Sequence, residues 1–336
     1  MRNKHAMPSR TLSRRRFLGS AAAGGLTLLL PRRGLGSSAI WSPALRGPDS
    51  LPDPSLPIGT ETLPKVKHIV VVMMENRSFD NYLGMLDRGD GFTLDRHGQP
   101  VNANPDGKGN LVRAFHMPST CQLHAHPGQN WDASHTALGL SPITSNDGFV
   151  VGSGEVAMGY WTEEDIPFYY GLARTFPLCE RYFCSVLAQT YPNRRFLLAG
   201  SAGGIISTTG AALTAPEPPN GSLLDRMNAY GVSWKNYYTD LPAVGVLLAT
   251  AGRNSDKLVK IDQFFADAAS GDLPDVSYVD PKFEEESEEN PDNIQVGESF
   301  VSRVVNAVLK SPAWPETLLI WTYDEHGGYY DHVRPP

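Results

Sequence analysis

The chain has 336 residues, of which 41% are hydrophobic, 10% aromatic and 19% charged. This is the composition of a globular protein with a sizeable core, and it excludes a disordered, collagen-like or coiled-coil chain. Residues 1–39 hold eight of the 29 Lys and Arg and none of the 36 Asp and Glu, which leaves 21 basic and 36 acidic residues, a net charge of −15, for the rest. Because so acidic a body repels polyanions, we expect no nucleic-acid partner.

The first 39 residues have the pattern of a twin-arginine export signal. The run Ser13–Gly19, which contains three consecutive Arg, precedes an apolar stretch at residues 20–30, and small residues at 36–39 offer a cleavage site. A disordered basic tail would account for the charge but not for the apolar stretch, which is too short to span a bilayer. We therefore predict that the twin-arginine translocase exports the protein, which is then periplasmic or secreted. Residues 40–64 are rich in Pro, Gly and Ser and predict a linker.

Strand-like and helix-like segments alternate after the linker. The predicted strands are residues 66–74, 232–238, 276–279 and 317–323, and the first and last of them are nearly continuous apolar runs. The predicted helices are residues 222–230, 260–269 and 298–309. This alternation predicts an α/β fold with a mostly parallel central sheet flanked by helices.

Three features stand apart from the alternation. Residues 87–154, rich in Gly, Asn, Asp, Pro and His, predict a long insertion near the functional site rather than a separate domain. The acidic run Glu284–Glu289 predicts a solvated loop. The three cysteines at positions 121, 179 and 184 match no zinc pattern, allow at most one disulfide and are expected to be buried as small apolar residues.

Pairs of oxygen-bearing residues follow the two strongest predicted strands. Glu75 and Asn76 come directly after the first, and Asp324 and Glu325 come directly after the last. In an open α/β sheet, ligands bind at the carboxyl ends of the strands, and hard divalent cations prefer carboxylate and amide oxygens. Acidic residues that cap helices are the alternative, but two pairs in equivalent positions favour a cation site.

Thr190 is the candidate nucleophile. It precedes a Pro by two residues and an apolar helical pattern by six, so the sequence places it at the N-cap of a helix. A structural cap is one reading of this Thr. The other is a hydroxyl that loses its proton more easily at a helix N-terminus beside a cation and can attack phosphorus.

Six of the nine histidines lie in two clusters. They are His116, His124, His126 and His135 in the first cluster and His326 and His332 in the second. An imidazole can protonate a departing alkoxide or hold a phosphoryl oxygen, so these clusters fit phosphoester chemistry.

Three long motifs, at residues 73–84, 190–194 and 323–333, resemble those of the bacterial phosphoesterase family. That family contains phosphatidylcholine-type phospholipases C and related acid phosphatases on an alkaline-phosphatase-like fold. The resemblance covers residues 65–336, which we take as one phosphoesterase domain. Its members are commonly exported by the twin-arginine route, in agreement with the reading of residues 1–39.

The resemblance implies a role for each candidate residue. It implies that a divalent metal ion is bound by Glu75, Asn76, Thr190, Asp324 and Glu325, and that Thr190 is also the nucleophile. It further implies that His135 faces the phosphoryl group, with His326 and His332 as additional catalytic candidates.

The chain departs from the family pattern at two places. Asn290 stands where the family places a site His, which would weaken protonation of the leaving group. Family members continue with further strands beyond the last motif, so a chain that ends at Pro336 is expected to be C-terminally incomplete.

The sequence as a whole predicts an exported, metal-dependent phospholipase C that contacts a membrane surface transiently and acts on a phospholipid or another phosphoester. An acid phosphatase of the same family and a catalytically inactive, truncated, secreted binding protein remain as alternatives.

Overall fold

The computed structural model describes residues 55, 57, 63, 65–121, 126–139 and 146–336. The predicted export signal at residues 1–39, most of the predicted linker at 40–64, and His124 lie outside the described residues. Within the described part of the chain, no helix has both the length and the apolar character needed to cross a membrane.

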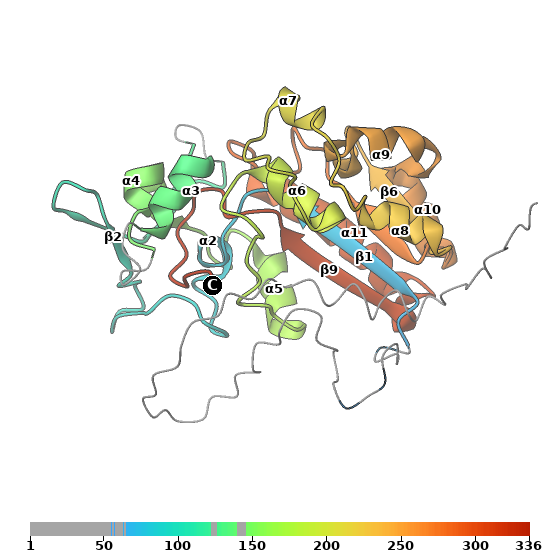
Figure 1. The fold of residues 1–336 in the computed structure, drawn as a ribbon. Helices are drawn as coiled ribbons and strands as arrows, with labels where there is room; N and C mark the ends of the chain where they lie inside the picture. Colours follow the sequence, from blue (N-terminus) through green and yellow to red (C-terminus); the bar gives the residue numbers. More distant parts are fainter. Residues whose placement is uncertain (1–54, 56, 58–62, 64, 122–125, 140–145) are drawn as a thin grey trace, which may run out of the picture.

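A five-stranded sheet forms the centre of the protein (Figure 1). Its strands are β1 His68–Met74, β6 Trp234–Tyr238, β7 Leu258–Lys260, β8 Val276–Val279 and β9 Thr317–Tyr323. The order across the sheet is β7-β6-β8-β1-β9, and every pairing in it is parallel. The predicted α/β fold with a mostly parallel sheet is therefore confirmed. The short edge strand β7 was not expected, because the sequence placed its last residue in the following helix.

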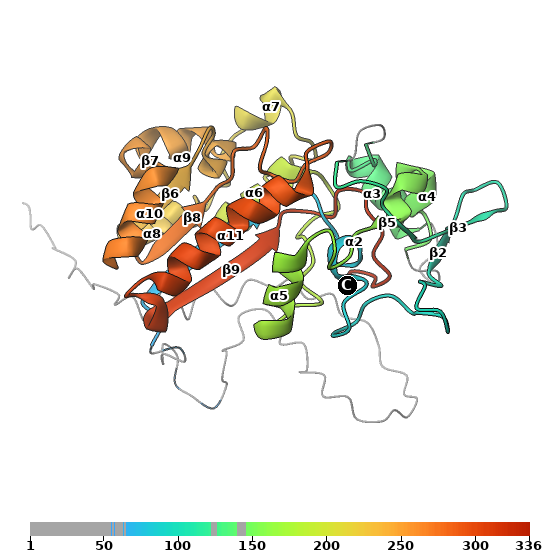
Figure 2. The same cartoon turned by 180° about the vertical axis from the view of Figure 1, so that it is seen from behind.

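One face of the sheet is covered by α5, α10 and α11, as Figure 2 shows. Their bounds are α5 Pro167–Thr175, α10 Ile261–Ser270 and α11 Ile294–Lys310. Val70 and Val72 of β1 are fully buried on this side, against a valine-rich stripe of α11. The α11 helix begins at Ile294 rather than at the predicted Glu298, because the Asn293 side chain caps it by accepting the Gln295 N–H at 3.0 Å.

The opposite face is covered by α6, α8 and α9, with α7 beside them (Figure 1). Their bounds are α6 Thr190–Ala199, α7 Gly210–Leu213, α8 Leu223–Ala229 and α9 Leu248–Arg253. Short 3₁₀-helices lie at Glu155–Met158 (η1), Ala243–Val246 (η2), Ser255–Lys257 (η3) and Trp314–Glu316 (η4). The predicted helix at residues 222–230 is α8, whose N-terminus is closed by a reciprocal capping box between Ser222 and Asp225.

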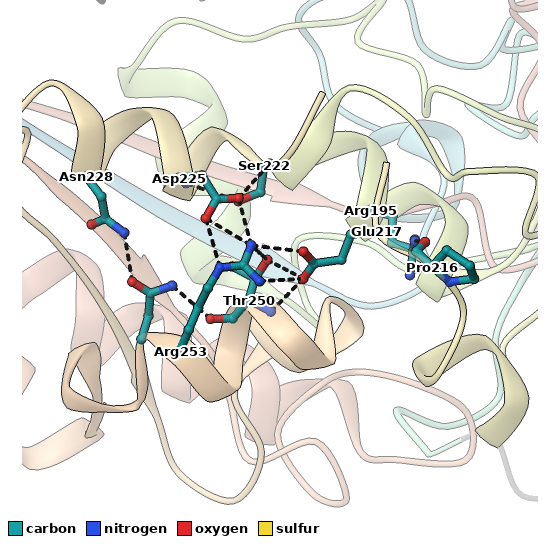
Figure 3. A network of polar contacts seen from close by, with 9 residues as sticks. Arg195, Pro216, Glu217, Ser222, Asp225, Asn228, Thr250 and Arg253 are labelled. Carbon is teal, nitrogen blue, oxygen red and sulfur yellow. Dashed lines mark hydrogen bonds and ion pairs between the residues drawn. The ribbon is translucent and has the colours of Figure 1, made fainter. Parts of the chain in front are cut away.

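An ion-pair network joins α8 to α9 on this outer face (Figure 3). The guanidinium of Arg253 lies 2.9 Å from a carboxylate oxygen of Glu217 and 2.9 Å from one of Asp225. The backbone N–H and the hydroxyl of Thr250 also donate to Glu217, at 2.6 and 2.5 Å. Partial burial alone would raise the pKa of both carboxyl groups, but the hydrogen bonds they accept lower each pKa below its ordinary value.

The described residues of the insertion at 87–154 form most of a lobe beyond the carboxyl ends of β1 and β9 (Figures 1 and 2). Its elements, with the segments packed on it, are α2 Phe79–Leu83, β2 Ala103–Pro105, β3 Leu111–Arg113, β4 Phe115–His116, α3 Trp131–Leu138, α4 Phe149–Ser153 and β5 Gly159–Tyr160. Strands β2 and β3 pair antiparallel, and β4 and β5 pair parallel. Tyr330, from the segment after β9, is part of the apolar cluster of this lobe. The insertion therefore packs against the end of the sheet where the candidate site was expected.

The acidic run does not form the solvated loop that the sequence predicts. Glu284 and Glu285 are exposed, but Glu288 is fully buried and Glu289 is half-buried. Three tyrosine hydroxyl groups surround the Glu288 carboxylate and take the place of solvent. The prediction is therefore wrong for the second half of the run.

Candidate functional site

Strands β1 and β9 bring the two predicted ligand pairs to one edge of the sheet. They are neighbours in the sheet, and Met74 pairs with Tyr323, so Glu75 and Asp324 begin side by side. The backbone N–H of Asn76 donates to Oδ1 of Asp324 at 3.3 Å. Asn76 is fully buried and has a φ of 67°, a left-handed conformation that Asn tolerates better than most residues. We call the five residues predicted to bind a metal ion, Glu75, Asn76, Thr190, Asp324 and Glu325, the metal cage.

Thr190 is brought to the same edge by α6. It is the first residue of that helix and is 7% exposed. Its hydroxyl donates to Oδ1 of Asn76 at 3.3 Å and makes no capping bond within the helix. The expectation that Thr190 is the N-cap is wrong, because Gln189 occupies that position and the hydroxyl of Thr208 accepts the N–H of Tyr191 at 3.1 Å. A structural cap therefore no longer accounts for the Thr190 hydroxyl.

Arg194 is a buried cation between two of the predicted ligands. Its Nε lies 2.9 Å from Oδ2 of Asp324, and a terminal guanidinium nitrogen lies 3.5 Å from Oε1 of Glu75. Burial alone would lower the pKa of Arg194, but Asp324, Glu75 and Asp280 raise it above its usual value. Arg194 was not among the predicted site residues, although its spacing of four residues from Thr190 places both on one face of a helix.

The carboxylates of the cage are crowded and buried. Burial raises the pKa of Glu75 and of Glu325 well above the usual value, and the charges of Asp324 and Glu289 raise both further. Burial also raises the pKa of Asp324, against the effect of Arg194. These shifts disfavour the charged forms of the carboxyl groups, and a divalent cation bound beside them would favour the charged forms.

The donor set of the cage suits a hard divalent cation. It offers three carboxylates, one amide oxygen and one hydroxyl. Glu325 is 3% exposed, and its Oε2 accepts the N–H of Gly327 at 2.7 Å, whereas its Oε1 has no hydrogen-bonding partner among the described residues. A buried carboxylate oxygen without a donor is costly, and a cation at the cage would satisfy it.

A second group of potential metal ligands, outside the metal cage, has its ligand atoms close together. In the described part of the chain, the one group of three His, Cys, Asp or Glu side chains with ligand atoms within 4.8 Å of one another is Asp80, Asp331 and His332. These atoms lie close enough to share one ion. However, Nδ1 of His332 lies 2.9 Å from Asp80 and Nε2 lies 3.1 Å from Asp90, and the hydrogen bond with Asp80 raises the His332 pKa to about 9. A protonated imidazole supplies the positive charge at this position.

His326 and His135 lie on either side of the contact between the lobe and the segment after β9. The Gly328 N–H donates to Nδ1 of His326 at 2.9 Å, so Nε2 carries the proton and donates to the Ser134 hydroxyl at 3.1 Å. Burial lowers the pKa of His326 to about 4, which keeps the ring neutral. The ring of His135 lies against the ring of Trp131, with centroids 4.1 Å apart and the two planes at 35°, and its Nδ1 lies 2.7 Å from the Trp131 carbonyl oxygen. No hydrogen bond or ion pair between described residues joins either His to the metal cage.

Asn290 and Glu289 lie behind the cage. The side-chain oxygen of Asn290 accepts from the Tyr329 hydroxyl at 2.7 Å and from Arg77 at 3.4 Å, so this residue is part of a buried polar cluster. Burial and the charge of Asp324 raise the pKa of Glu289 to about 7, while its hydrogen bond with Gln129 acts in the other direction. Glu289 was predicted to lie in a solvated loop, so its proximity to the cage was not expected.

Cys184 lies near the cage, where its surroundings disfavour the thiolate form. Burial, together with the charges of Glu325 and Asp324, raises its pKa to about 12. None of the three cysteines forms a disulfide, and Cys179 is exposed, contrary to the expectation that all three are buried.

The chain matches one protein family and is similar to several phospholipases C. The model of the phosphoesterase family matches residues 66–336. A non-hemolytic phospholipase C of Pseudomonas aeruginosa is 29% identical over 308 residues, covering 82% of this chain and 44% of the relative. A non-specific phospholipase C1 of Arabidopsis thaliana is 31% identical over 297 residues, covering 81% and 54%. Phospholipase C A of Mycobacterium tuberculosis is 29% identical over 321 residues, covering 82% and 60%. The chain thus spans about half the length of the curated relatives it matches.

Proposed function

Because this chain belongs to the phosphoesterase family, we propose that it is an exported, metal-dependent phosphodiesterase of the phospholipase C type. The observation that carries the proposal is the position of the Thr190 hydroxyl. It lies at the N-terminus of α6, has no capping role and contacts Asn76 in a buried, carboxylate-rich cage. The names of the relatives favour a phospholipid as the substrate.

In this proposal, the Thr190 oxygen attacks phosphorus and displaces the alcohol, which leaves a phosphothreonine ester. Water then attacks the same phosphorus, breaks the ester bond and regenerates the Thr190 hydroxyl. Asn76 orients the hydroxyl by accepting its hydrogen bond, and the N-terminal end of α6 favours negative charge at this oxygen. A divalent cation bound by the cage would stabilise charge on the phosphoryl oxygens.

We propose that His135 acts on the phosphoryl group or the leaving alcohol, as the resemblance to the family implies. Its Nδ1 is engaged by the Trp131 carbonyl, so Nε2 is the atom it presents to a substrate. His326 and His332 fit this task less well, because each has both ring nitrogens engaged by neighbouring residues. We propose that these two histidines hold the segment after β9 in place.

A substrate panel tests the proposed reaction. Purified protein stripped of metal by a chelator is assayed on phosphatidylcholine vesicles and on p-nitrophenyl phosphate, with Mg²⁺, Ca²⁺, Mn²⁺ or Zn²⁺ restored one at a time. We expect metal-dependent release of phosphocholine, and loss of both turnover and bound metal in Asp324→Ala. Turnover of the monoester alone would identify an acid phosphatase of the same family. Absence of turnover with every metal would favour an inactive binding protein.

The proposed export has its own test. The translocase recognises the guanidinium pair rather than the charge alone, so replacing Arg14 and Arg15 by Lys should retain the precursor inside the cell. Cell fractionation with an activity or antibody readout measures this. If the double variant reaches the periplasm or the medium as well as the wild type does, the twin-arginine assignment is wrong. An exported enzyme of this type would meet its lipid substrate by transient contact with a membrane surface.

A further inference from the structure

A buried carboxylate lies behind the metal cage and is not part of it. Glu288 is 0% exposed, and its carboxylate accepts three tyrosine hydroxyl groups. They come from Tyr169 at 2.5 Å, Tyr323 at 2.6 Å and Tyr82 at 3.1 Å. These tyrosines belong to α5, β9 and α2, so one side chain joins three elements that are distant in the sequence.

The same residue is linked to both ligand pairs of the cage. Tyr323, which donates to Glu288, directly precedes Asp324. Ser287, which directly precedes Glu288, accepts the backbone N–H of Glu75 at 3.0 Å through its carbonyl oxygen. A displacement of Glu288 would therefore affect the end of β9 through the hydrogen bond from Tyr323. It would affect the end of β1 through Ser287, which is bonded to the backbone of Glu75.

The backbone at Glu288 is held as firmly as the side chain. Its φ is 74°, in the left-handed region, and its carbonyl oxygen accepts a hydrogen bond from Arg77. The guanidinium of Arg77 is in turn enclosed by the rings of Tyr82, Trp161 and Tyr329, whose centroids lie 4.8–5.6 Å from it. An unfavourable backbone conformation persists only where the surrounding contacts determine it.

Helix α11 leaves space for this carboxylate. A Cβ atom at Gly297 would lie 2.2 Å from Cγ and 2.7 Å from Oε1 of Glu288. Gly is a poor helix former, and Ala at this position would favour α11 if the space were not needed. An apolar side chain in place of Glu288 could fill this space without the cost of burying a carboxylate. The carboxylate instead accepts three hydroxyl donors on its two oxygens, and these hydrogen bonds fix the position of the side chain.

We propose that Glu288 is a positioning residue for the metal cage, holding the loop between β8 and α11 so that the strand ends of β1 and β9 keep their ligands in register. The inference rests on the proposed function, because the cage is its target. Glu288 acts through Tyr323 and Ser287 and touches neither metal nor substrate. Residues that orient metal ligands in this way change metal affinity by about 10- to 100-fold when they are removed.

The test measures Mn²⁺ affinity by electron paramagnetic resonance, together with kcat and KM on phosphatidylcholine. Glu288→Gln should raise the Mn²⁺ dissociation constant at least tenfold and lower kcat at subsaturating Mn²⁺, with KM nearly unchanged. A saturating concentration of Mn²⁺ should restore most of the lost rate, which a simple loss of folded protein would not allow. Tyr323→Phe and Gly297→Ala should shift the dissociation constant in the same direction by a smaller factor.

Glu298→Gln is the matched control. Glu298 is another buried glutamate, on α11, whose Oε1 accepts the backbone N–H groups of Phe168 and Tyr169 at 2.8 and 3.1 Å. Gln keeps the side-chain oxygen that accepts both N–H groups, so Tyr169 should stay in place and this variant should keep the wild-type Mn²⁺ affinity. If Glu288→Gln does not fold, Tyr323→Phe decides the question.

The outcomes separate this inference from the proposed function. If the wild type binds Mn²⁺, Asp324→Ala does not, and both Glu288→Gln and Tyr323→Phe keep the wild-type affinity, the positioning role is refuted and the cage stands. If the wild type neither binds Mn²⁺ nor turns over a phosphoester with any metal, the proposed function fails and this inference fails with it.

Discussion

Replacing Thr190 by Ala separates a catalytic role from a structural one. The hydroxyl makes one hydrogen bond of 3.3 Å to Asn76 and no capping bond. Loss of one neutral hydrogen bond costs about 1 kcal/mol, and loss of one buried methyl group costs about 1 kcal/mol more. We therefore expect Thr190→Ala to lower the free energy of unfolding by about 2 kcal/mol and Thr190→Ser by about 1 kcal/mol, because Ser loses only the methyl group.

The expected loss of rate is much larger than the loss of stability. Without a nucleophilic oxygen, kcat of Thr190→Ala should fall at least about 10³-fold, which corresponds to about 4 kcal/mol of transition-state stabilisation. Thr190→Ser should keep part of the activity because it keeps the oxygen. The measurements are denaturant unfolding, to correct for the folded fraction, and release of phosphocholine from phosphatidylcholine.

A matched control and a chemical trap complete this test. Thr208 supplies the hydroxyl that caps α6, so Thr208→Ala should cost about 1 kcal/mol of stability and leave the rate per folded molecule unchanged. Acid quenching during turnover should trap a phosphoryl adduct on the peptide that contains Thr190, visible by mass spectrometry. An active Thr190→Ala variant, together with an unmodified peptide in the active wild type, would refute the assignment of Thr190 as nucleophile.

Three further predictions concern stability around the sheet. Arg194→Ala leaves Asp324 buried without its cation, so the free energy of unfolding measured in the presence of a chelator should fall by about 3–5 kcal/mol. Adding Mn²⁺ should restore part of this loss. A loss below about 1 kcal/mol would contradict the contribution of the ion pair. Arg253→Ala should cost about 1 kcal/mol at pH 7. The pKa values of its two carboxylate partners are lowered in the folded state. Their contribution to stability is therefore fully present above the pKa values of the unfolded chain, about 4, and is lost as the pH falls through the lowered values. Wild type and variant should converge in unfolding experiments at pH values below the lowered pKa values. Gly327→Ala should abolish turnover, because its Cβ would lie 2.0 Å from the backbone oxygen of Asn76 in the cage. Gly204 also has a positive φ but has open space around it, so Gly204→Ala should lose only about 1 kcal/mol of stability. Equal effects of the two substitutions would contradict this packing.

Local sequence patterns were sufficient for the fold class and for four of the five strands of the central sheet. Apolar runs identified β1 and β9, because a strand buried on both faces of a parallel sheet needs apolar side chains at successive positions. The rule that ligands bind at the carboxyl ends of such strands then placed Glu75 near Asp324. The register of β1 and β9 confirmed that proximity, although the two residues are far apart in the sequence.

Tertiary structure alone decided how the buried charges are balanced. Nothing in the run Glu284–Glu289 distinguishes the buried Glu288 from the exposed Glu284 and Glu285, and its three phenol donors come from positions 35, 119 and 206 residues away. In the same way, Arg194 reaches Asp324 across 130 residues, and the histidine at position 332 reaches Asp80 across 252 residues. A charged side chain can be buried only where the fold supplies its partners, so its burial depends on contacts that no local pattern encodes.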